Sequence, residues 1–159
     1  MSTLLLVVSG AHAADIGTTP REPAENPWLD LDLLADVTII VDGHRVARSP
    51  RTWSADCPGE QVIEIRFRRP TTVTRLRVVT REAELSRTQE MTIWASSRRG
   101  ERHQEILHRR FTFTPGGATE HVEECALQLE QVSVLRVRIV PAIDGQRAVT
   151  HVSELHVAA

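Results

Sequence analysis

The chain has 159 residues, which suits a single domain, and a formal net charge of −2, which argues against a dedicated nucleic-acid-binding protein because such proteins carry a clear basic excess. Hydrophobic residues make up 41% of the chain and charged residues 25%, a composition typical of a globular protein that excludes disorder throughout. All 19 basic residues are arginine. Two explanations are open: codon bias in a GC-rich genome, or recognition of carboxylates, phosphates and sugar hydroxyls by guanidinium groups.

The N-terminal region, residues 1–34, contains two kinds of segment. Residues 4–8 form a short apolar run, and residues 11–13 resemble the small-x-small cleavage site of a secretory signal, but no basic residue precedes the run. We interpret this segment as an opening β-strand, which favours a cytoplasmic location over a secreted one while leaving both open. Three prolines between residues 20 and 27 then forbid regular helix and central strand. We therefore expect an N-terminal strand and a Pro-rich connecting loop that pack on, or lead into, a domain spanning residues 35–159.

From Val37 onward the sequence is typical of short β-strands. An apolar run ends at the turn pair Asp42-Gly43, and residues 61–67 alternate apolar and charged side chains, the period of a half-buried strand. The same alternation recurs at 76–80, 91–95, 106–114, 122–129, 135–139 and 152–157. Eight or nine short strands with no helical stretch between them predict an all-β domain, either a sandwich or a barrel. No stretch approaches the roughly 20 apolar residues of a membrane-spanning helix, so we expect no membrane span.

Cysteines and tryptophans are few. Cys57 and Cys125 could form one bridge, but buried free thiols are the favoured interpretation. Trp53 and Trp94 occupy positions typical of a packed core, and Trp28 is the indole ring most available to a ligand. The paired acids Glu123 and Glu124 suit the edge of a sheet better than its centre.

Several short motifs follow one another between residues 35 and 157. They are Asp42-Gly43-His44 after a strand, Thr52-Trp53-Ser54, a strand that opens with Gln61, the run 91–96 and the closing run 153–157 with Glu154-Leu155. In this order they resemble the discoidin or coagulation-factor type C superfamily, nearest to the family 32 carbohydrate-binding modules. The resemblance implies that the all-β domain is a two-sheet antiparallel jelly-roll sandwich of the galactose-binding-domain-like kind, with eight or nine strands.

The resemblance also implies a structural Ca²⁺. Members of the superfamily often hold this ion near the aspartate-glycine turn and the closing glutamate, which correspond here to Asp42 and Glu154, with carbonyl groups from residues 44–52. Ca²⁺ prefers six to eight hard oxygen ligands, which carboxylates and turn carbonyls supply. The alternative is that Asp42 caps its own turn and that Glu154 faces solvent or an arginine.

Sugar-binding members of the superfamily use loops at one end of the sandwich. The comparable loops here are 43–53, 81–89, 97–103 and 141–150. The candidate ligand-binding side chains on these loops are His44, Arg45, Arg81, Glu82, Arg87, Asp144 and Arg147. The loops lack the aromatic ring that usually lies under a sugar.

We therefore predict a non-catalytic ligand-binding module, with a carbohydrate bound at the loop end as the first interpretation. A protein–protein adaptor that uses an Arg-rich sheet face is the alternative, and a nucleic-acid-associated scaffold is the more distant one. The sequence contains no Cys-x-x-Cys, His-Glu-x-x-His, glycine-rich phosphate loop or Gly-x-Ser-x-Gly motif, so we do not expect an enzyme.

Overall fold

The computed structural model describes residues 28–29, 37–42, 44–46, 52–97 and 103–159. These residues form nine antiparallel strands and no helix, as predicted. The strands are β1 (Trp28–Leu29), β2 (Val37–Val41), β3 (His44–Val46), β4 (Trp53–Ser54), β5 (Gln61–Arg81), β6 (Arg87–Ser96), β7 (Gln104–Phe113), β8 (Glu120–Val140) and β9 (His151–Ala158).

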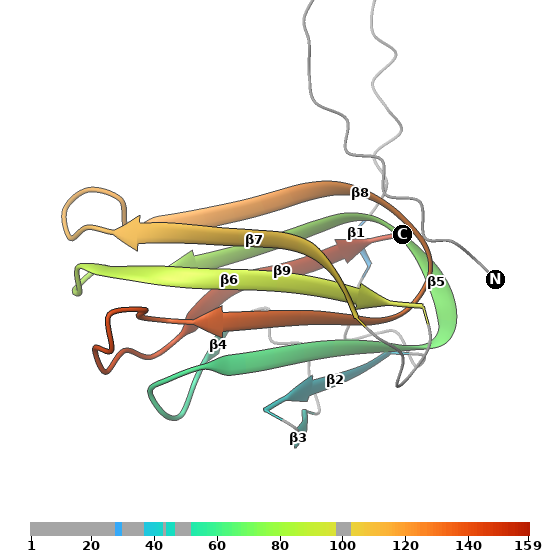
Figure 1. Cartoon of the computed structure of the whole chain (residues 1–159), viewed down its shortest axis with the longest axis horizontal. Coiled ribbons are helices and arrows are strands. Elements are labelled where there is room, and N and C mark those ends of the chain that lie inside the picture. The colour runs from blue at the N-terminus through green and yellow to red at the C-terminus, as the bar shows by residue number, and fades with distance from the viewer. Residues whose placement is uncertain (1–27, 30–36, 43, 47–51, 98–102) are drawn as a thin grey trace, which may run out of the picture.

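Two long strands run through both layers of the sandwich (Figure 1). In the first layer β3, β2, the first half of β5, the second half of β8, β6 and β7 lie in that order. In the second layer the first half of β8 pairs with the second half of β5, which pairs with β9; β1 and β4 pair with β9. The acidic pair at 123–124 therefore lies on an edge segment, as predicted, because β5 is its only ladder partner.

The bend in β5 corrects one sequence prediction. Residues 61–67 and 76–80, expected as separate strands, belong to one strand that bends between Arg66 and Arg75, where its pairing with β8 shifts register. Pro70 is exposed at this bend, which suits a residue that cannot donate to a ladder. Gln131 on β8 has a φ of 58° beside the same bend, a bulge-like irregularity that turns the strand.

Because both long strands double back, both ends of each lie at one end of the sandwich (Figure 1). We call this the loop end; it carries the connections 55–60, 82–86, 114–119 and 141–150. The opposite end holds the two bends. The connection after β6 begins there, because the Ser133 hydroxyl donates to the Ser97 carbonyl at 2.8 Å beside the bend of β8. The loop 97–103, which we expected among the ligand-binding loops, thus starts at the wrong end of the sandwich for that role.

The core lies between the two layers and follows the alternation of the sequence. Ile65, Leu135 and Val137 on the first layer and Val78 and Val157 on the second have no exposed surface. Burying a side chain of this size stabilises the fold by about 1.5–3 kcal/mol. The apolar face of each strand therefore provides the main favourable term in folding.

The two described tryptophan side chains differ. Trp53 is partly buried against the core, as predicted. Trp94 lies between the core residues Ile93 and Ala95 and opposite Arg136, so it is on the outer face of the first layer. The prediction that Trp94 packs in the core was wrong, because alternation along β6 assigns the smaller neighbours to the interior.

Both cysteines are free, as predicted, but only in part buried. Cys57 is exposed on the loop end, and Cys125 is half-buried on β8. Burial raises the pKa of the Cys125 thiol to about 11, and the charge of Glu123 adds to the shift, so this thiol is protonated at neutral pH.

Most of the region 1–34 lies outside the described residues. Its last described part, Trp28–Leu29, pairs with Ala158 and Val157 of β9 as an added strand of the second layer. No helix long and apolar enough to cross a membrane occurs in the described parts of the chain.

Candidate functional site

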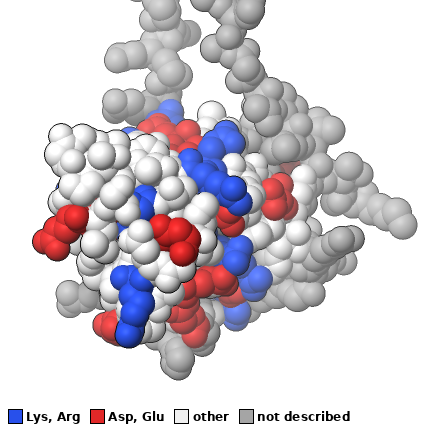
Figure 2. All heavy atoms as spheres, turned by 60° about the vertical axis from the view of Figure 1, so that its left-hand side comes forward, with Lys and Arg blue, Asp and Glu red and all other residues white. Residues whose placement is uncertain are grey.

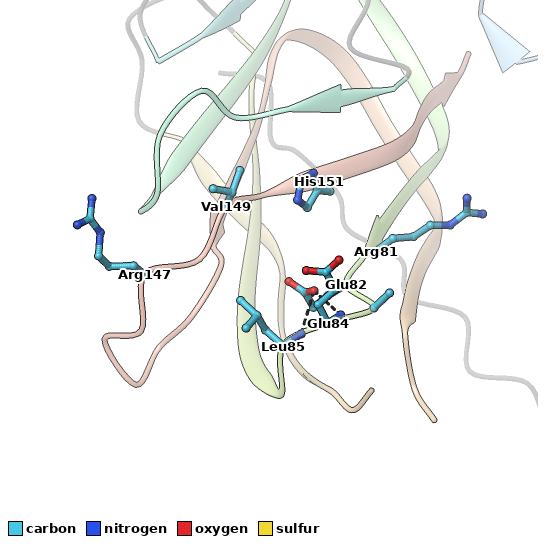
Figure 3. A pocket seen from close by; sticks show the side chains of 8 residues that line it. Arg81, Glu82, Glu84, Leu85, Arg147, Val149 and His151 are labelled. Carbon is cyan, nitrogen blue, oxygen red and sulfur yellow. Dashed lines mark hydrogen bonds between the residues drawn. The ribbon is translucent and has the colours of Figure 1, made fainter. Parts of the chain in front are cut away.

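A hollow of about 450 Å³ opens at the loop end, between the end of β5, the loop 82–86, the loop 141–150 and the start of β9 (Figure 3). Its lining residues are Arg81, Glu82, Ala83, Glu84, Leu85, Arg147, Val149 and His151. The structure thus brings together three of the residues that the sequence suggested, Arg81, Glu82 and Arg147. It adds Glu84, Leu85, Val149 and His151, which were not among the candidates.

The first wall of the hollow is held in shape by Glu82. This residue is 9% exposed, and its Oε1 accepts hydrogen bonds from the backbone N–H groups of Glu84 at 2.9 Å and Leu85 at 3.1 Å. Its Oε2 accepts a bond from Nε of Arg87 at 2.9 Å. Desolvation by burial raises the pKa of Glu82, but these hydrogen bonds outweigh it and leave the pKa lowered. Glu82 is therefore an ionised anchor of the loop 82–86.

Arg87 connects the loop 82–86 to the loop 141–150. Its side chain is fully buried, its terminal amino groups donate to the carbonyls of Pro141 and, at 3.5 Å, Val149, and its guanidinium lies 4.8 Å from the ring centre of Phe113. We expected Arg87 to contact a ligand from a surface loop. The structure instead buries the Arg87 side chain, which contacts the Phe113 ring and bonds to the two loop carbonyls. Arg87 therefore positions the loops and does not reach solvent.

The centre of the hollow contains hydrogen-bonding groups beside short aliphatic ones. In Figure 3 His151 and the carboxylates of Glu82 and Glu84 lie toward the middle, with Leu85 and Val149 at one side. The His151 ring is exposed, and its Nδ1 lies 2.7 Å from Oγ of Ser54. Leu85 is 41% exposed. A large apolar side chain in a loop that also holds two glutamates was the sequence signal that could have identified this site.

Arg81 and Arg147 flank the hollow on opposite sides (Figure 3). Arg81 is 60% exposed, and its Nε donates to Oε2 of Glu120 at 2.5 Å. Arg147 is exposed and has no ion pair or hydrogen bond to any residue that the structure describes. The Arg81 guanidinium therefore has one of its donors bonded within the protein, and the Arg147 guanidinium has none bonded to a described residue.

The remaining ligand-binding candidates are Asp144, His44 and Arg45, of which only the Asp144 side chain is described, and it is not among the lining residues. The Asp144 carboxylate accepts bonds from the backbone N–H of Gln146 at 3.2 Å and from its side-chain amide at 2.8 Å, next to Gly145 with a φ of 82°, so it shapes the turn of its loop. His44 and Arg45 lie on β3, opposite Val41 and Ile40, at the edge of the first layer. Their side chains are outside the described part of the structure.

The residues proposed for Ca²⁺ do not fit a joint site. Oδ1 of Asp42 accepts the backbone N–H of Val62 at 2.8 Å in the first layer, whereas Glu154 accepts Nε of Arg77 at 2.9 Å on the second layer. The contact of Glu154 with an arginine matches one part of the alternative that we considered, whereas Asp42 bonds to β5 rather than capping its own turn. Most of the carbonyl groups expected as further Ca²⁺ ligands lie outside the described residues, so the Ca²⁺ site stays a prediction. Among the described residues no group of three or more His, Cys, Asp or Glu side chains could hold a metal ion.

The outer faces of both layers carry paired charges. On the first layer Glu64 binds Arg66 at 2.7 Å and Arg136 at 2.5 Å, and on the second layer Arg77 bridges Glu124 at 2.8 Å and Glu154 at 2.9 Å. Figure 2 shows the same mixture of acidic and basic groups over one side of the molecule. These arginines are matched by glutamates on the same strand or on a neighbouring one, so the described sheet faces do not form a basic surface.

No protein-family model matches the sequence, and no curated protein does so either. The structure, however, resembles solved ones. A family 32 carbohydrate-binding module from Clostridium perfringens, solved in complex with GalNAc-β-1,3-galactose, matches with a TM-score of 0.57 and 9% identity over 84% of this chain and 100% of the module. A mutant of a GH29 fucosidase from Ruminococcus gnavus, solved in complex with fucose, matches with a TM-score of 0.57 and 10% identity over 82% of this chain.

The chain spans 26% of the length of that fucosidase. At identities of 9% and 10% these likenesses establish the fold. The jelly-roll sandwich of the galactose-binding-domain-like kind, expected from the order of the sequence motifs, is thereby confirmed.

Proposed function

We propose that the chain is a non-catalytic binding module that takes a hydroxyl-rich ligand of the saccharide class in the hollow at the loop end. The observation that carries the proposal is the composition of this hollow: Glu84 and His151 offer hydrogen-bonding groups beside the aliphatic surfaces of Leu85 and Val149. A sugar presents the same combination, with hydroxyl groups along its edges and C–H groups on its faces. Pockets for small ligands combine apolar walls with a few placed polar groups in this way.

Two of the solved structures that this chain resembles support the saccharide class. The Clostridium perfringens module was solved with GalNAc-β-1,3-galactose and the Ruminococcus gnavus enzyme with fucose, and both share the fold of this chain. The hollow also lies at the loop end, which is the part of the sandwich where the sequence resemblance locates sugar binding.

Ground-state binding, rather than catalysis, suits the protonation states of the described groups. The carboxyl groups with shifted pKa values, which include Glu82 and Glu64, are all shifted downward, so they are ionised at neutral pH and are not general acids. Burial keeps the Cys125 thiol protonated and therefore poorly nucleophilic. The protein-adaptor alternative draws less support, because the arginines on the described sheet faces are already paired with glutamates.

A glycan array followed by titration calorimetry on its strongest positive tests the proposal. We expect Glu84→Gln and His151→Ala each to weaken binding by about tenfold, the effect of losing one hydrogen bond to a charged or polar group. Glu130→Gln, an exposed acid near the bend of β8, is the matched control and leaves the affinity unchanged. Binding that survives both substitutions in the hollow, or an array without any positive, would reject the proposal.

A further inference from the structure

The guanidinium groups beside the hollow differ from those on the sheet faces. Arg136 and Arg138 on β8 have glutamate oxygens at 2.5 and 2.6 Å. Arg147 has no acidic partner among the residues that the structure describes, although its loop is fixed from within by the bond of Arg87 to the Pro141 carbonyl. An exposed guanidinium on an anchored loop keeps all five N–H donors for a ligand.

Arg81, on the opposite flank, retains most of its donors as well. Its Nε is occupied by Glu120, but its two terminal amino groups make no hydrogen bond to the described residues. The Arg81 side chain is 60% exposed. Both flanks of the hollow therefore present donors in the planar arrangement that binds carboxylate, sulfate or phosphate oxygens in pairs.

The centre of the hollow has the opposite character. Figure 3 shows the guanidinium groups of Arg81 and Arg147 directed outward on either side, with the Glu82 and Glu84 carboxylates between them. A small anion in the centre would face carboxylates, whereas neutral hydroxyls there would donate to them. A ligand that fits this order has hydroxyl groups in its middle and negative groups on both sides.

From this order we infer that the ligand is an acidic polysaccharide that lies across the hollow, with neutral hydroxyls at Glu84 and His151 and anionic substituents over Arg81 and Arg147. This inference rests on the proposed function. A nucleic acid, which also carries repeated negative charges, fits less well: no Phe, Tyr or Trp side chain is among the described lining residues to form a platform for stacked bases, and Glu84 repels phosphate. The ligand class is thus a chain of uronic-acid or sulfated sugars.

The test compares polymers that differ in charge. We would titrate the chain with polygalacturonate, whose sugars carry carboxylates, with heparin, whose sugars carry sulfates, and with neutral galactan and poly-dT. We expect polygalacturonate or heparin to bind at least about tenfold more tightly than galactan at low salt, because each flank gains a charge-assisted contact. This advantage should shrink as the salt concentration is raised to about 0.5 M, because interactions between exposed charges are largely screened at that concentration.

Matched substitutions assign the effect to the hollow. Arg147→Gln should weaken binding of the acidic polymer by about tenfold and leave galactan unaffected, and Arg81→Gln should act in the same direction. Arg110→Gln removes the same charge from a 63% exposed arginine that pairs with Glu90 on the sheet face, and should change the affinity less than twofold. Equal effects of Arg147→Gln and Arg110→Gln would show only a dependence on net charge and would overturn the inference.

The remaining outcomes separate this inference from the proposed function. Galactan that binds as tightly as polygalacturonate and heparin, and is lost in Glu84→Gln, overturns the acidic class while sustaining a saccharide site. Silence of both acidic polymers overturns the inference, and the glycan array then decides the proposed function separately. Comparable binding of poly-dT overturns the assignment to a saccharide.

Discussion

Glutamate and arginine side chains have different roles on the sheet faces and at the loop end. On the sheet faces glutamates pair with arginines of the same strand or of a neighbouring strand, as where Glu64 binds both Arg66 and Arg136. At the loop end the charges divide into two sets. Arg87 and Glu82 are buried and bonded to each other, whereas Glu84 and Arg147 line the hollow without an ion pair to the described residues.

This difference shows which charges stabilise the fold and which remain for a partner. A buried pair is costly to break, an exposed pair contributes little, and an exposed unpaired group contributes nothing to folding. The loss of unfolding free energy on substitution should therefore be largest for a buried pair, smaller for an exposed pair and smallest for an exposed unpaired group.

The largest effect is expected for Arg87→Met. The variant would leave the buried Glu82 carboxylate without its guanidinium and the Pro141 carbonyl without its donor, which should cost about 3–5 kcal/mol of unfolding free energy. Urea denaturation followed by circular dichroism measures the loss. Arg110→Met, at a 63% exposed position, is the control and should stay within about 0.5 kcal/mol of the parent. A loss below 1 kcal/mol for Arg87→Met, roughly that of an exposed pair, would contradict the structural role assigned to it.

A smaller loss, about 1–2 kcal/mol, is expected for Glu64→Gln, because its two arginine partners keep only weaker bonds to an amide. Desolvation raises the pKa of Glu64, but the bonds from Arg136 and Arg66 outweigh it, so the folded-state pKa is lowered from 4.5. Its contribution is thus complete above the unfolded pKa and is lost as pH falls through the folded value. The difference between parent and variant should therefore shrink on acidification, and a difference that grows below pH 4.5 would reject this account.

Arg138→Gln should cost less than about 1 kcal/mol. Its bond to Glu60 is short, at 2.6 Å, but the two side chains are 35% and 47% exposed, so water and salt screen the pair. Thermal melts at low and high ionic strength provide the measurement. The difference should be smallest at high salt, and a loss comparable to that of Arg87→Met would erase the distinction between exposed and buried pairs.

The smallest effect on stability is expected at the hollow itself. Glu84→Gln should leave the unfolding free energy within about 0.5 kcal/mol of the parent, because its carboxylate has no hydrogen bond to the described residues. The same substitution should weaken ligand binding, so the calorimetric and denaturation data would separate. A clear destabilisation would show that Glu84 serves the fold rather than a ligand.

The fold was more predictable than the site because its signals are local. The alternation around Ile63 and Ile65 follows from strand geometry and needs no knowledge of distant residues. That residues 61–67 and 73–80 form one bent strand depends on the irregular pairing with β8, some sixty residues further on, which no local pattern contains.

The site depended on such distant contacts throughout. Arg81 and Arg147 could be selected from the loops that the family resemblance indicates. Arg87 was misassigned because its burial requires Phe113, Pro141 and Val149, which the chain brings together only after folding. His151 was not among the candidates, since its place beside the hollow follows from the pairing of β9 with the end of β5.

The doubling back of β5 and β8 also bears on how such a module could be re-engineered. Grafting new recognition loops onto the scaffold leaves both bends and the interlayer packing untouched, because the hollow is formed by connections at the other end. The segments 82–86 and 141–150 are not independent inserts, however, since Arg87 bonds to both. The smallest transferable unit is therefore the two loops together with that arginine. A library that randomised 82–86 alone would remove Glu82, the carboxylate that holds the arginine on which 141–150 also depends.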